Sequence, residues 1–486
     1  MTLLPESVAM VELAASYVAG KWVSDAHAGT LDVTSPTTGE VLGTVGVAGR
    51  DEVDSAVTAA RGALPAWGRV SAADRGAALG RLAEALNARK GELADLTTAE
   101  IGSPRSWSTF GQVVTAVGVL RSYAAITPDY PFSSTRASMT GGTVEVRQLP
   151  VGVVAAIVPW NTPLFIAALK LGPALAAGCT VVLKPAPDAP LEFGVLMEAI
   201  EEAGLPDGVV NVVNGGAETG ELLTEHPGVD KISFTGSTAV GAGIAASCGS
   251  RIRRCSTELG GKSAAIVLPD APIETTVPGL VAGVMGNNGQ LCAALTRILL
   301  PRSRYDDFVA ALTSAVGDLV VGDPADRATD IGPLINEAAR ERVEGFLHRA
   351  PGEGATVLVG GERPDHPGWF VSPALVAATN DMEIAREEVF GPVAVVIAYD
   401  DTAADDAEAV AIANDSRYGL VGAVWSADEE RAAAVAAQLL VGSVAVNSTA
   451  VLDFASPFGG FKQSGIGREG GPEGIAGFVE YQAIIR

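Results

Sequence analysis

Short apolar runs alternate with amphipathic stretches in the middle of the chain, between about residues 144 and 268. The apolar runs cover residues 151–158, 180–184, 209–213 and 231–234, and helical patterns follow at residues 164–178, 191–204 and 218–226. Nearly continuous apolar strands that alternate with helices are typical of a parallel sheet covered on both faces. The pattern predicts a doubly wound α/β domain, whose ligands bind beyond the carboxyl ends of its strands.

The flanking regions predict further units. A short β-like stretch at residues 33–45 leads into alanine-rich helices over residues 51–99. After Leu268 a second alternating series includes residues 355–361, 392–399, 420–426 and 442–447. Since 486 residues are too many for one compact core, we expect two or three domains, one of them a second α/β unit.

The charge excludes some partners. The formal net charge is −24, whereas a nucleic-acid partner requires a basic surface. Residues 149–169 carry no charge, but Pro150, Pro159 and Pro163 interrupt them. A strand, a loop and the start of a helix explain this stretch better than a membrane span. We therefore expect no nucleic-acid partner and no membrane partner.

The chain has four cysteines: Cys179, Cys248, Cys255 and Cys292. Four thiols in so long a chain do not form a disulfide framework, and no pair has the spacing of metal ligands. We expect a cytoplasmic protein without a metal site.

Two short strings follow predicted strands. In PWNTP, residues 159–163, two prolines bound a rigid loop, and Asn161 could donate to a developing oxyanion. In FTGST, residues 234–238, a glycine and a serine at a helix start could bind a diphosphate through backbone N–H groups. Read alone, each string could also be an ordinary turn or a plain helix cap.

Two further strings carry candidate reactive groups. Glu258 begins ELGGK, where glycines allow close approach of a ligand, and a partly desolvated carboxylate could act as a base for water. Cys292 in NNGQLCAALTR follows a glycine-containing turn, where backbone amides would lower the pKa of a thiol. The alternatives are a surface glutamate before a turn and a buried, inert cysteine.

Taken together and in order, the strings PWNTP, KPAP, FTGST, ELGGK, GQLC, EEVFGP and PFGGFKQSGIGREG resemble the aldehyde dehydrogenase superfamily. The resemblance runs from about Pro36 to the end of the chain. It implies a Rossmann-type cofactor domain, an α/β catalytic domain and a small β-element for oligomerisation.

The resemblance implies a role for each catalytic position. Cys292 would be the nucleophile, Glu258 the general base and Asn161 the oxyanion donor, together with the Cys292 backbone N–H. Lys170 and Glu469 match positions associated with proton relay to the base. An aldehyde would be oxidised to a carboxylic acid through a cysteine thiohemiacetal and a thioester, with reduction of NAD(P)⁺.

The resemblance also implies positions for the cofactor and the substrate. The cofactor positions are Ile157, Val158, Pro159, Trp160, Lys184, Gly220, Phe234, Gly236, Ser237, Val240, Leu259, Glu388 and Phe390. The substrate-tunnel positions are Thr162, Phe165, Leu169, Leu291, Leu452 and Phe458. Because the tunnel positions are uncharged, we expect a neutral aliphatic or aromatic aldehyde, and not one that carries a carboxylate.

One departure concerns the cofactor. Many NAD-preferring members have a glutamate three residues after the lysine, where this chain has Pro187 followed by Asp188. The barrier to a 2′-phosphate is weaker without that carboxylate, although Asp188 could replace part of it. We expect NAD as the cofactor, with NADP possible.

By the resemblance, residues 1–123 and 146–257 form the cofactor domain and residues 258–445 the catalytic domain. Residues 124–145 and 446–486 form the oligomerisation element and the C-terminal segment. Since exchanged strands cover sheet edges, we expect a homodimer or homotetramer. Two alternatives remain open: a semialdehyde dehydrogenase that acylates coenzyme A, which typically lacks the glutamate base, and a non-catalytic protein that keeps the fold.

Overall fold

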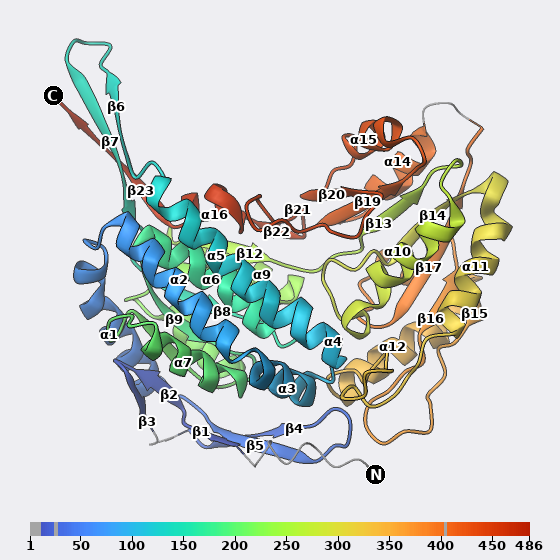
Figure 1. Ribbon diagram of the computed structural model, residues 1–486, viewed down its shortest axis with the longest axis horizontal. Helices are drawn as coiled ribbons and strands as arrows, with labels where there is room; N and C mark the ends of the chain where they lie inside the picture. Colours follow the sequence, from blue (N-terminus) through green and yellow to red (C-terminus); the bar gives the residue numbers. More distant parts are fainter. Residues whose placement is uncertain (1–10, 24–27, 403–405) are drawn as a thin grey trace.

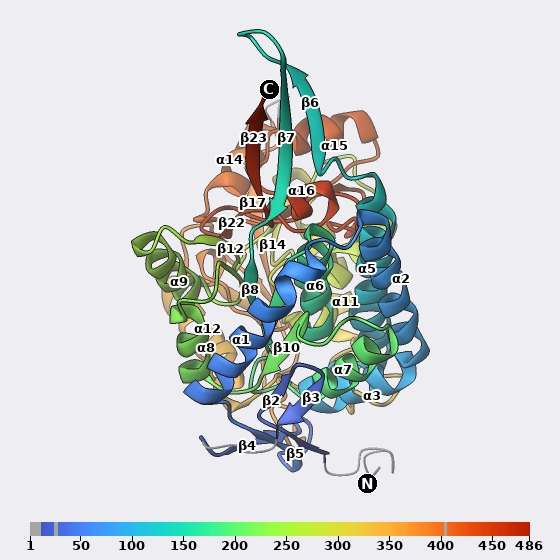
Figure 2. The ribbon, with the colours of Figure 1, turned by 90° about the vertical axis from the view of Figure 1, so that its left-hand side faces the viewer.

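The chain forms two α/β halves and a three-stranded sheet that projects from the body (Figure 1). The structure is a computed structural model, and it describes residues 11–23, 28–402 and 406–486. The second view shows the projecting sheet standing clear of both halves, with the C-terminal end of the chain on it (Figure 2).

The first half is built on an eight-stranded sheet. In spatial order its strands are β22 (Gly465–Ile466), β12 (Arg254–Glu258), β11 (Lys231–Thr235), β8 (Val153–Ile157), β9 (Thr180–Lys184), β10 (Val210–Val213), β2 (Ser16–Val18) and β3 (Lys21–Val23). The five strands from β12 to β10 are parallel. Both faces of β8, β9 and β11 are buried, which explains their continuous apolar sequences.

Helices cover both faces of this sheet. One face packs against α1 (Arg50–Trp67), α8 (Ala217–Glu225) and α9 (Thr238–Ser250). The other packs against α2 (Ala72–Ala88), α5 (Thr115–Ile126), α6 (Pro163–Ala177) and α7 (Glu192–Glu202), with α3 (Lys90–Ile101) beside α7. Nearly every residue of α6 is buried, because the helix lies between the sheet and α5. The predicted doubly wound domain is confirmed.

The second half has a seven-stranded sheet. Its spatial order is β15 (Thr356–Val359), β16 (Ala374–Ala377), β17 (Val393–Tyr399), β14 (Arg297–Pro301), β13 (Ala264–Val267), β19 (Val421–Trp425) and β20 (Ser443–Val446). All pairs are parallel except β15 with β16. The helices on its two faces are α10 (Ile273–Met285) with α11 (Tyr305–Gly317), and α12 (Glu337–Arg349) with α14 (Ala407–Asn414) and α15 (Glu429–Ala436). The expected second α/β unit is present.

The projecting sheet has the antiparallel order β23 (Val479–Ile485), β7 (Thr143–Pro150), β6 (Ser133–Ala137). The other elements are short. They are β1 (Val11–Leu13), β4 (Thr30–Thr34), β5 (Val41–Gly46), β18 (Tyr418–Gly419), β21 (Phe461–Lys462), α4 (Arg105–Trp107), a π-helical segment (Ser108–Val114), α13 (Glu383–Arg386), α16 (Gly471–Ala476) and 3₁₀ turns at Thr127–Asp129, Gly286–Gly289, Arg302–Arg304 and Ala350–Glu353. Within the described residues, no helix combines the length and apolar character that crossing a membrane requires.

A glycine makes the close contact of α5 with α6 possible. A Cβ atom at Gly172 would lie 2.4 Å from the Tyr123 ring. We expect Gly172→Ala to destabilise the fold by about 1–3 kcal/mol, because the buried ring has little room to move. Gly62→Ala is the matched control: Gly62 is also helical, a Cβ there would have no described atom within 4 Å, and the variant should gain up to about 1 kcal/mol. Thermal and urea unfolding measure both, and equal midpoints for the two variants would contradict the assignment.

Candidate active site

Cys292 lies in a loop between α10 and β14. The loop begins with Asn287 and Asn288, whose φ angles of 51° and 59° are left-handed, a conformation that asparagine tolerates better than most residues. Asn288 Nδ2 donates to the carbonyls of Gly102 and Pro333 at 2.9 Å, and its Oδ1 accepts the Gly332 N–H at 2.7 Å. The two asparagines of the NNGQ string therefore anchor the loop that carries the thiol.

Asn161 lies beside this loop and belongs to the other half. Its carbonyl accepts the side-chain amides of Gln112 and Asn287, both at 2.9 Å, and its own Nδ2 donates to the Gln290 carbonyl at 2.7 Å. One N–H of that amide remains for another acceptor. Asn161 is 5 % exposed, so its donor is desolvated and held in place.

A cavity of about 420 Å³, the catalytic cavity, brings many of the sequence-predicted residues together. Predicted residues in its lining are Pro159, Trp160, Asn161, Thr162, Gly236, Ser237, Glu258, Leu259, Cys292, Glu388 and Phe390. They come from the carboxyl ends of β8, β11 and β12 in the first half and from two loops of the second half. This is the edge at which doubly wound sheets bind ligands.

The surroundings of Cys292 favour the protonated form of its thiol. Burial raises the pKa of the Cys292 thiol to about 12, and the carboxylates of Glu388 and Glu258 act in the same direction. The backbone amides of Ala293 and Cys292 lower the pKa, but by less than burial raises it. The expectation of a lowered thiol pKa is therefore wrong, because desolvation and two nearby carboxylates outweigh the amides of the turn. A base must take the proton as the thiol reacts.

Glu258 ends β12 and is 4 % exposed, and neither of its carboxylate oxygens has a hydrogen-bond partner among the described residues. Burial raises the pKa of Glu258 well above its usual value, and Glu469 adds to this rise, whereas Lys170 and Arg468 oppose it. A Cβ at Gly459, where φ is +150°, would lie 2.6 Å from Glu258 Oε1. Only glycine leaves room for the carboxylate in this position.

Lys170 and Glu469 form a buried ion pair behind Glu258. Lys170 Nζ lies 2.7 Å from Glu469 Oε1 and 3.3 Å from Ser233 Oγ, and the two charged side chains are 0 % and 2 % exposed. Lys170 comes from α6, and the backbone of Glu469 pairs with Phe458. The sequence resemblance placed both residues near the base, and in the structure both influence the Glu258 pKa.

The cofactor positions cluster at the start of α9 and on the Glu388 loop. Ser237 caps α9, and its Oγ accepts the Val240 N–H. Phe234 lies in β11 below this cap, and the side chain of Leu259 packs where a Cβ of Gly241 would otherwise stand, at 2.3 Å. The remaining N–H groups of the first turn of α9 can bind an anion.

The Glu388 loop closes the opposite wall. Glu388 Oε1 accepts the Gly261 N–H at 3.0 Å, and a Cβ at Gly260 would lie 2.5 Å from Oε2. Burial raises the pKa of Glu388, although the Gly261 amide and Arg342 counteract it. Phe390 has a φ of 63° and meets the Trp160 ring edge-on, 5.6 Å between centroids.

Other predicted residues lie outside this lining. Ile157 ends β8, and Val158 follows it in the core. Lys184 ends β9, donates to the Pro185 carbonyl at 2.9 Å and lies beside Gly220. Burial lowers the pKa of Lys184 to about 8, and Asp188 opposes this shift.

The tunnel positions divide between two places. Phe458 belongs to the same apolar cluster as Leu452 and Cys292, whereas Leu169 and Phe165 pack in the core of the first half. Leu291 borders Gly286. Thr162 lines the catalytic cavity.

Some residues of the site were not predicted from the sequence. Thr235, Gly260, Asn336 and Arg342 line the catalytic cavity, and Gly459 supports Glu258. Gly260 and Gly459 stand inside quoted strings, but no sequence signal pairs Gly459 with Glu258, 201 positions earlier. Arg342 donates to the carbonyls of Glu388 at 2.5 Å and Val389 at 3.3 Å, contacts that only the tertiary structure creates.

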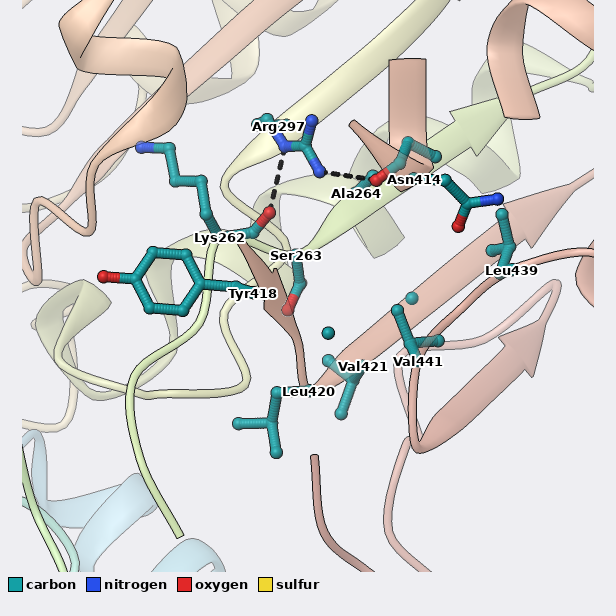
Figure 3. A pocket seen from close by; sticks show the side chains of 13 residues that line it. Lys262, Ser263, Ala264, Arg297, Asn414, Tyr418, Leu420, Val421, Leu439 and Val441 are labelled. Atoms are coloured by element: carbon teal, nitrogen blue, oxygen red, sulfur yellow. Dashed lines mark hydrogen bonds between the residues drawn. The ribbon is translucent and has the colours of Figure 1, made fainter. Parts of the chain in front are cut away.

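A small enclosed cavity of about 10 Å³ lies behind the ELGGK segment (Figure 3). Arg297 borders it, donates to the Lys262 carbonyl at 2.9 Å and to the Ala413 carbonyl at 2.8 Å, and so anchors that segment. The Lys262 Nζ is buried with no hydrogen-bond partner in the described part of the chain. This space holds one water molecule at most, so it is too small for a substrate. Among the residues that the structure describes, no group of three or more His, Cys, Asp or Glu side chains is placed to hold a metal ion.

Comparisons with known proteins identify the family of the chain. The model of the "Aldehyde dehydrogenase family" matches residues 22–484. A geranial dehydrogenase of Castellaniella defragrans is 42 % identical over 471 residues, 96 % of this chain and 98 % of the relative. A 3-succinoylsemialdehyde-pyridine dehydrogenase of Pseudomonas is 41 % identical, over 96 % and 98 % of the two chains. The crystal structure of a Mycobacterium tuberculosis aldehyde dehydrogenase complexed with NAD⁺ superposes with a TM-score of 0.95 at 42 % identity, over 98 % and 99 % of the two chains. This chain belongs to the aldehyde dehydrogenase family.

Proposed function

We propose that the protein oxidises an aldehyde to the carboxylic acid with NAD⁺, through a thiohemiacetal and a thioester on Cys292. The observation that carries this proposal is the meeting of Cys292, Asn161 and Glu258 on one cavity, although they come from distant parts of the chain. A thiol, an amide donor and a desolvated carboxylate are the three groups that this reaction requires.

The cavity fits a dinucleotide. The N-terminus of α9 with Ser237 suits the diphosphate, and the free oxygen of Glu388 suits ribose hydroxyls. Gly260 leaves the space into which the Glu388 carboxylate reaches. Lys184, beyond this lining, would reach the adenosine ribose, with Gly220 beside it. When bound, the nicotinamide supplies the hydride acceptor.

The side chains perform the remaining steps. Cys292 Sγ forms a bond to the aldehyde carbon while its proton passes to Glu258. The oxyanion accepts hydrogen bonds from Asn161 Nδ2 and the Cys292 N–H, and its collapse with loss of hydride leaves a thioester. Glu258 then removes a proton from water, the water oxygen attacks the thioester carbon, and the carbon–sulfur bond breaks to release the acid and the thiol.

Glu258 must lose its first proton before it can act on water. The buried pair of Lys170 and Glu469 supports a route for that proton, since Lys170 Nζ also contacts Ser233. The glutamate base argues against the coenzyme A-acylating alternative. A non-catalytic protein would have no reason to keep a carboxylate in a buried place that raises its pKa well above the usual value, a state that costs free energy.

We propose a neutral aliphatic or aromatic aldehyde as substrate. Thr162, Phe165, Leu169, Leu291, Leu452 and Phe458 carry no charge, and Leu452 and Phe458 share an apolar cluster with Cys292. The names of relatives do not choose between substrates, because a geranial dehydrogenase and a 2-hydroxymuconic semialdehyde dehydrogenase of Pseudomonas match at 42 % and 37 % identity.

We propose a homodimer or homotetramer formed through the projecting sheet. Tyr481 and Ile485 of β23, at one edge of the projecting sheet, are 64 % and 71 % exposed. Among the described strands, β20 forms an edge of the seven-stranded sheet, because it pairs with β19 alone. A strand of a second copy would cover such an edge.

The domain division, at residues 123, 145, 257 and 445, is part of the same proposal. The four unpaired cysteines support a cytoplasmic location.

Two substitutions test the chemistry. Cys292→Ala should abolish NADH formation from propanal, at least 10³-fold, because it removes the nucleophile. Glu258→Gln should slow both the first turnover of NADH and the steady-state rate, the latter at least 10²-fold, because the thiol and the hydrolytic water both lose their base. Rapid-mixing absorbance at 340 nm distinguishes the two. A wild-type protein that forms no NADH from any aldehyde, or a Glu258→Gln protein that turns over at the normal rate, would contradict the proposal.

The pH dependence tests the carboxylates. Since burial raises the pKa of Glu258, kcat should rise with pH as Glu258 ionises, at a higher pH than an ordinary glutamate would require. Glu469→Gln removes a negative neighbour, so the pKa of Glu258 falls and the acid limb of kcat moves to lower pH by about one unit. Glu473→Gln, in α16 and exposed, is the control and should leave the limb in place. A limb that moves upward or stays fixed in Glu469→Gln would refute the coupling.

Cofactor preference tests Asp188. Its Oδ1 accepts a hydrogen bond from Asn336 at 3.1 Å, and its charge acts on Lys184. We expect kcat/KM to be higher with NAD⁺ than with NADP⁺, because a carboxylate repels a 2′-phosphate. Asp188→Asn keeps the shape and should reduce the preference about fivefold, the effect of about 1 kcal/mol of repulsion between charges separated by water. Steady-state kinetics with both cofactors measures this preference. An unchanged ratio of kcat/KM for NAD⁺ to kcat/KM for NADP⁺ would show that Asp188 does not determine it.

A further inference from the structure

Cys248 and Cys255 lie side by side in the first half, away from the catalytic cavity, and we name them the dithiol pair. Cys248 lies in the last turn of α9, which is at the left in Figure 2, and Cys255 is the second residue of β12. Both belong to one apolar cluster, in which Cys248 is buried and Cys255 partly buried. Their side chains are in hydrogen-bond contact, with the Cys248 thiol as the donor. The two sulfurs therefore need only a short movement to form a bond.

A tight turn between α9 and β12 holds the dithiol pair together. The Cys248 carbonyl accepts the N–H groups of Arg251 and Arg253, at 3.1 and 2.9 Å, so the chain reverses directly after the helix. Ile252 in this turn is 93 % exposed and has a φ of 53°, a conformation that β-branched residues adopt rarely. Such strain persists only where the surrounding structure imposes it. The backbone of the turn thus fixes the two thiols beside each other.

The charges around the dithiol pair favour a thiolate on Cys255. The hydrogen bond from Cys248 lowers the pKa of Cys255 to about 6, and the Lys231 ammonium acts in the same direction, although burial opposes both. The pKa of Cys248 is raised, because its proton is held by the Cys255 sulfur and burial adds to this effect, whereas Arg253 and Lys231 oppose it. Near neutral pH, Cys255 is therefore the nucleophilic thiolate and Cys248 the thiol beside it.

The other two cysteines lack this combination. Cys179 is buried, its thiol donates to the Phe478 carbonyl at 3.3 Å, and burial raises its pKa to about 11. Burial also raises the pKa of Cys292, to about 12. Peroxides react with thiolates, and cysteines that respond to them typically have a low pKa, some exposure and a second thiol nearby. In this chain the dithiol pair has all three features.

From these observations we propose that Cys248 and Cys255 are a modification site, which a peroxide oxidises to a reversible disulfide between α9 and β12. The Cys255 thiolate attacks one oxygen of hydrogen peroxide, the oxygen–oxygen bond breaks, and hydroxide leaves a sulfenic acid on Cys255. The Cys248 sulfur then attacks the Cys255 sulfur, and the hydroxyl group leaves with the Cys248 proton as water. The two sulfurs lose two electrons in total, and the peroxide gains them. A dithiol reductant reverses the reaction by exchange.

Peptide mapping tests this proposal, because trypsin places the four cysteines on four different peptides. Cys248 falls on residues 232–251 and Cys255 on residues 255–262. The wild-type protein is treated with hydrogen peroxide near pH 7, alkylated and digested, and the peptides are identified by mass spectrometry. We expect these two peptides to become cross-linked at least tenfold faster than either of the other cysteines is oxidised. Dithiothreitol should abolish the cross-link.

Three variants separate the roles of the two thiols. Cys248→Ala removes both the hydrogen-bond donor and the second thiol, so peroxide should leave Cys255 as a sulfenic acid that dimedone labels. Iodoacetamide near pH 7 should alkylate Cys255 at least fivefold more slowly in this variant, because the pKa of Cys255 returns toward its ordinary value. Cys248→Ser keeps a donor and should restore most of that rate without a disulfide. Cys179→Ala is the matched control and should leave the cross-link unchanged.

The proposal does not rest on the proposed function, because Cys292 takes no part in it. A wild-type protein that forms no cross-linked peptide pair, or one in which Cys292 is oxidised before the pair forms, would overturn it. So would alkylation of Cys255 at the same rate in Cys248→Ala as in the wild type. Since the mapping uses the wild type, a variant that folds poorly does not affect that result.

Discussion

The site depends on hydrogen bonds that tie the Cys292 loop to both halves of the molecule. Asn287 donates to the backbone of Asn161 in the first half, and Asn288 binds Gly102 and the segment at Pro333. These bonds hold two successive residues in left-handed backbone conformations, which cost free energy for most side chains. Without them the thiol and its oxyanion donor would lie on separate bodies.

Burial sets the protonation states of the reactive groups. It raises the pKa of both Cys292 and Glu258, so both groups hold protons more tightly than they would in water. A thiol that is mostly protonated is protected from unwanted oxidation, and it becomes a nucleophile only when a base is available. The paired charges of Lys170 and Glu469 lie close enough to act on that base in opposite directions. The geometry therefore links the nucleophile to the hydrolytic step through one carboxylate.

Glycines have two different functions around the site. Gly459 has a backbone conformation that glycine adopts readily, and it also makes room for Glu258. Gly286 has an ordinary backbone conformation, so the only effect of glycine there is to leave space beside Trp107 and Leu291. The distinction matters for variation within the fold, because a position of the second kind can accept a side chain without backbone strain.

Local pattern alone determined the strands of the parallel sheet, such as residues 180–184 and 231–234, because burial on both faces imposes continuous apolar sequence. Motif strings, read through a family resemblance, placed Cys292, Glu258 and Asn161 together before any coordinates. The sequence predicts a lowered pKa for the Cys292 thiol, and the structure gives a raised one. A turn sequence indicates backbone amides near the thiol, whereas desolvation depends on which other segments cover the turn. Gly459 beside Glu258 and Arg342 on the Glu388 loop depend on contacts between segments far apart in the chain. Only the tertiary structure decided them, because a sequence specifies periodicity and local conformation, while distance in space follows from how complete sheets and helices pack.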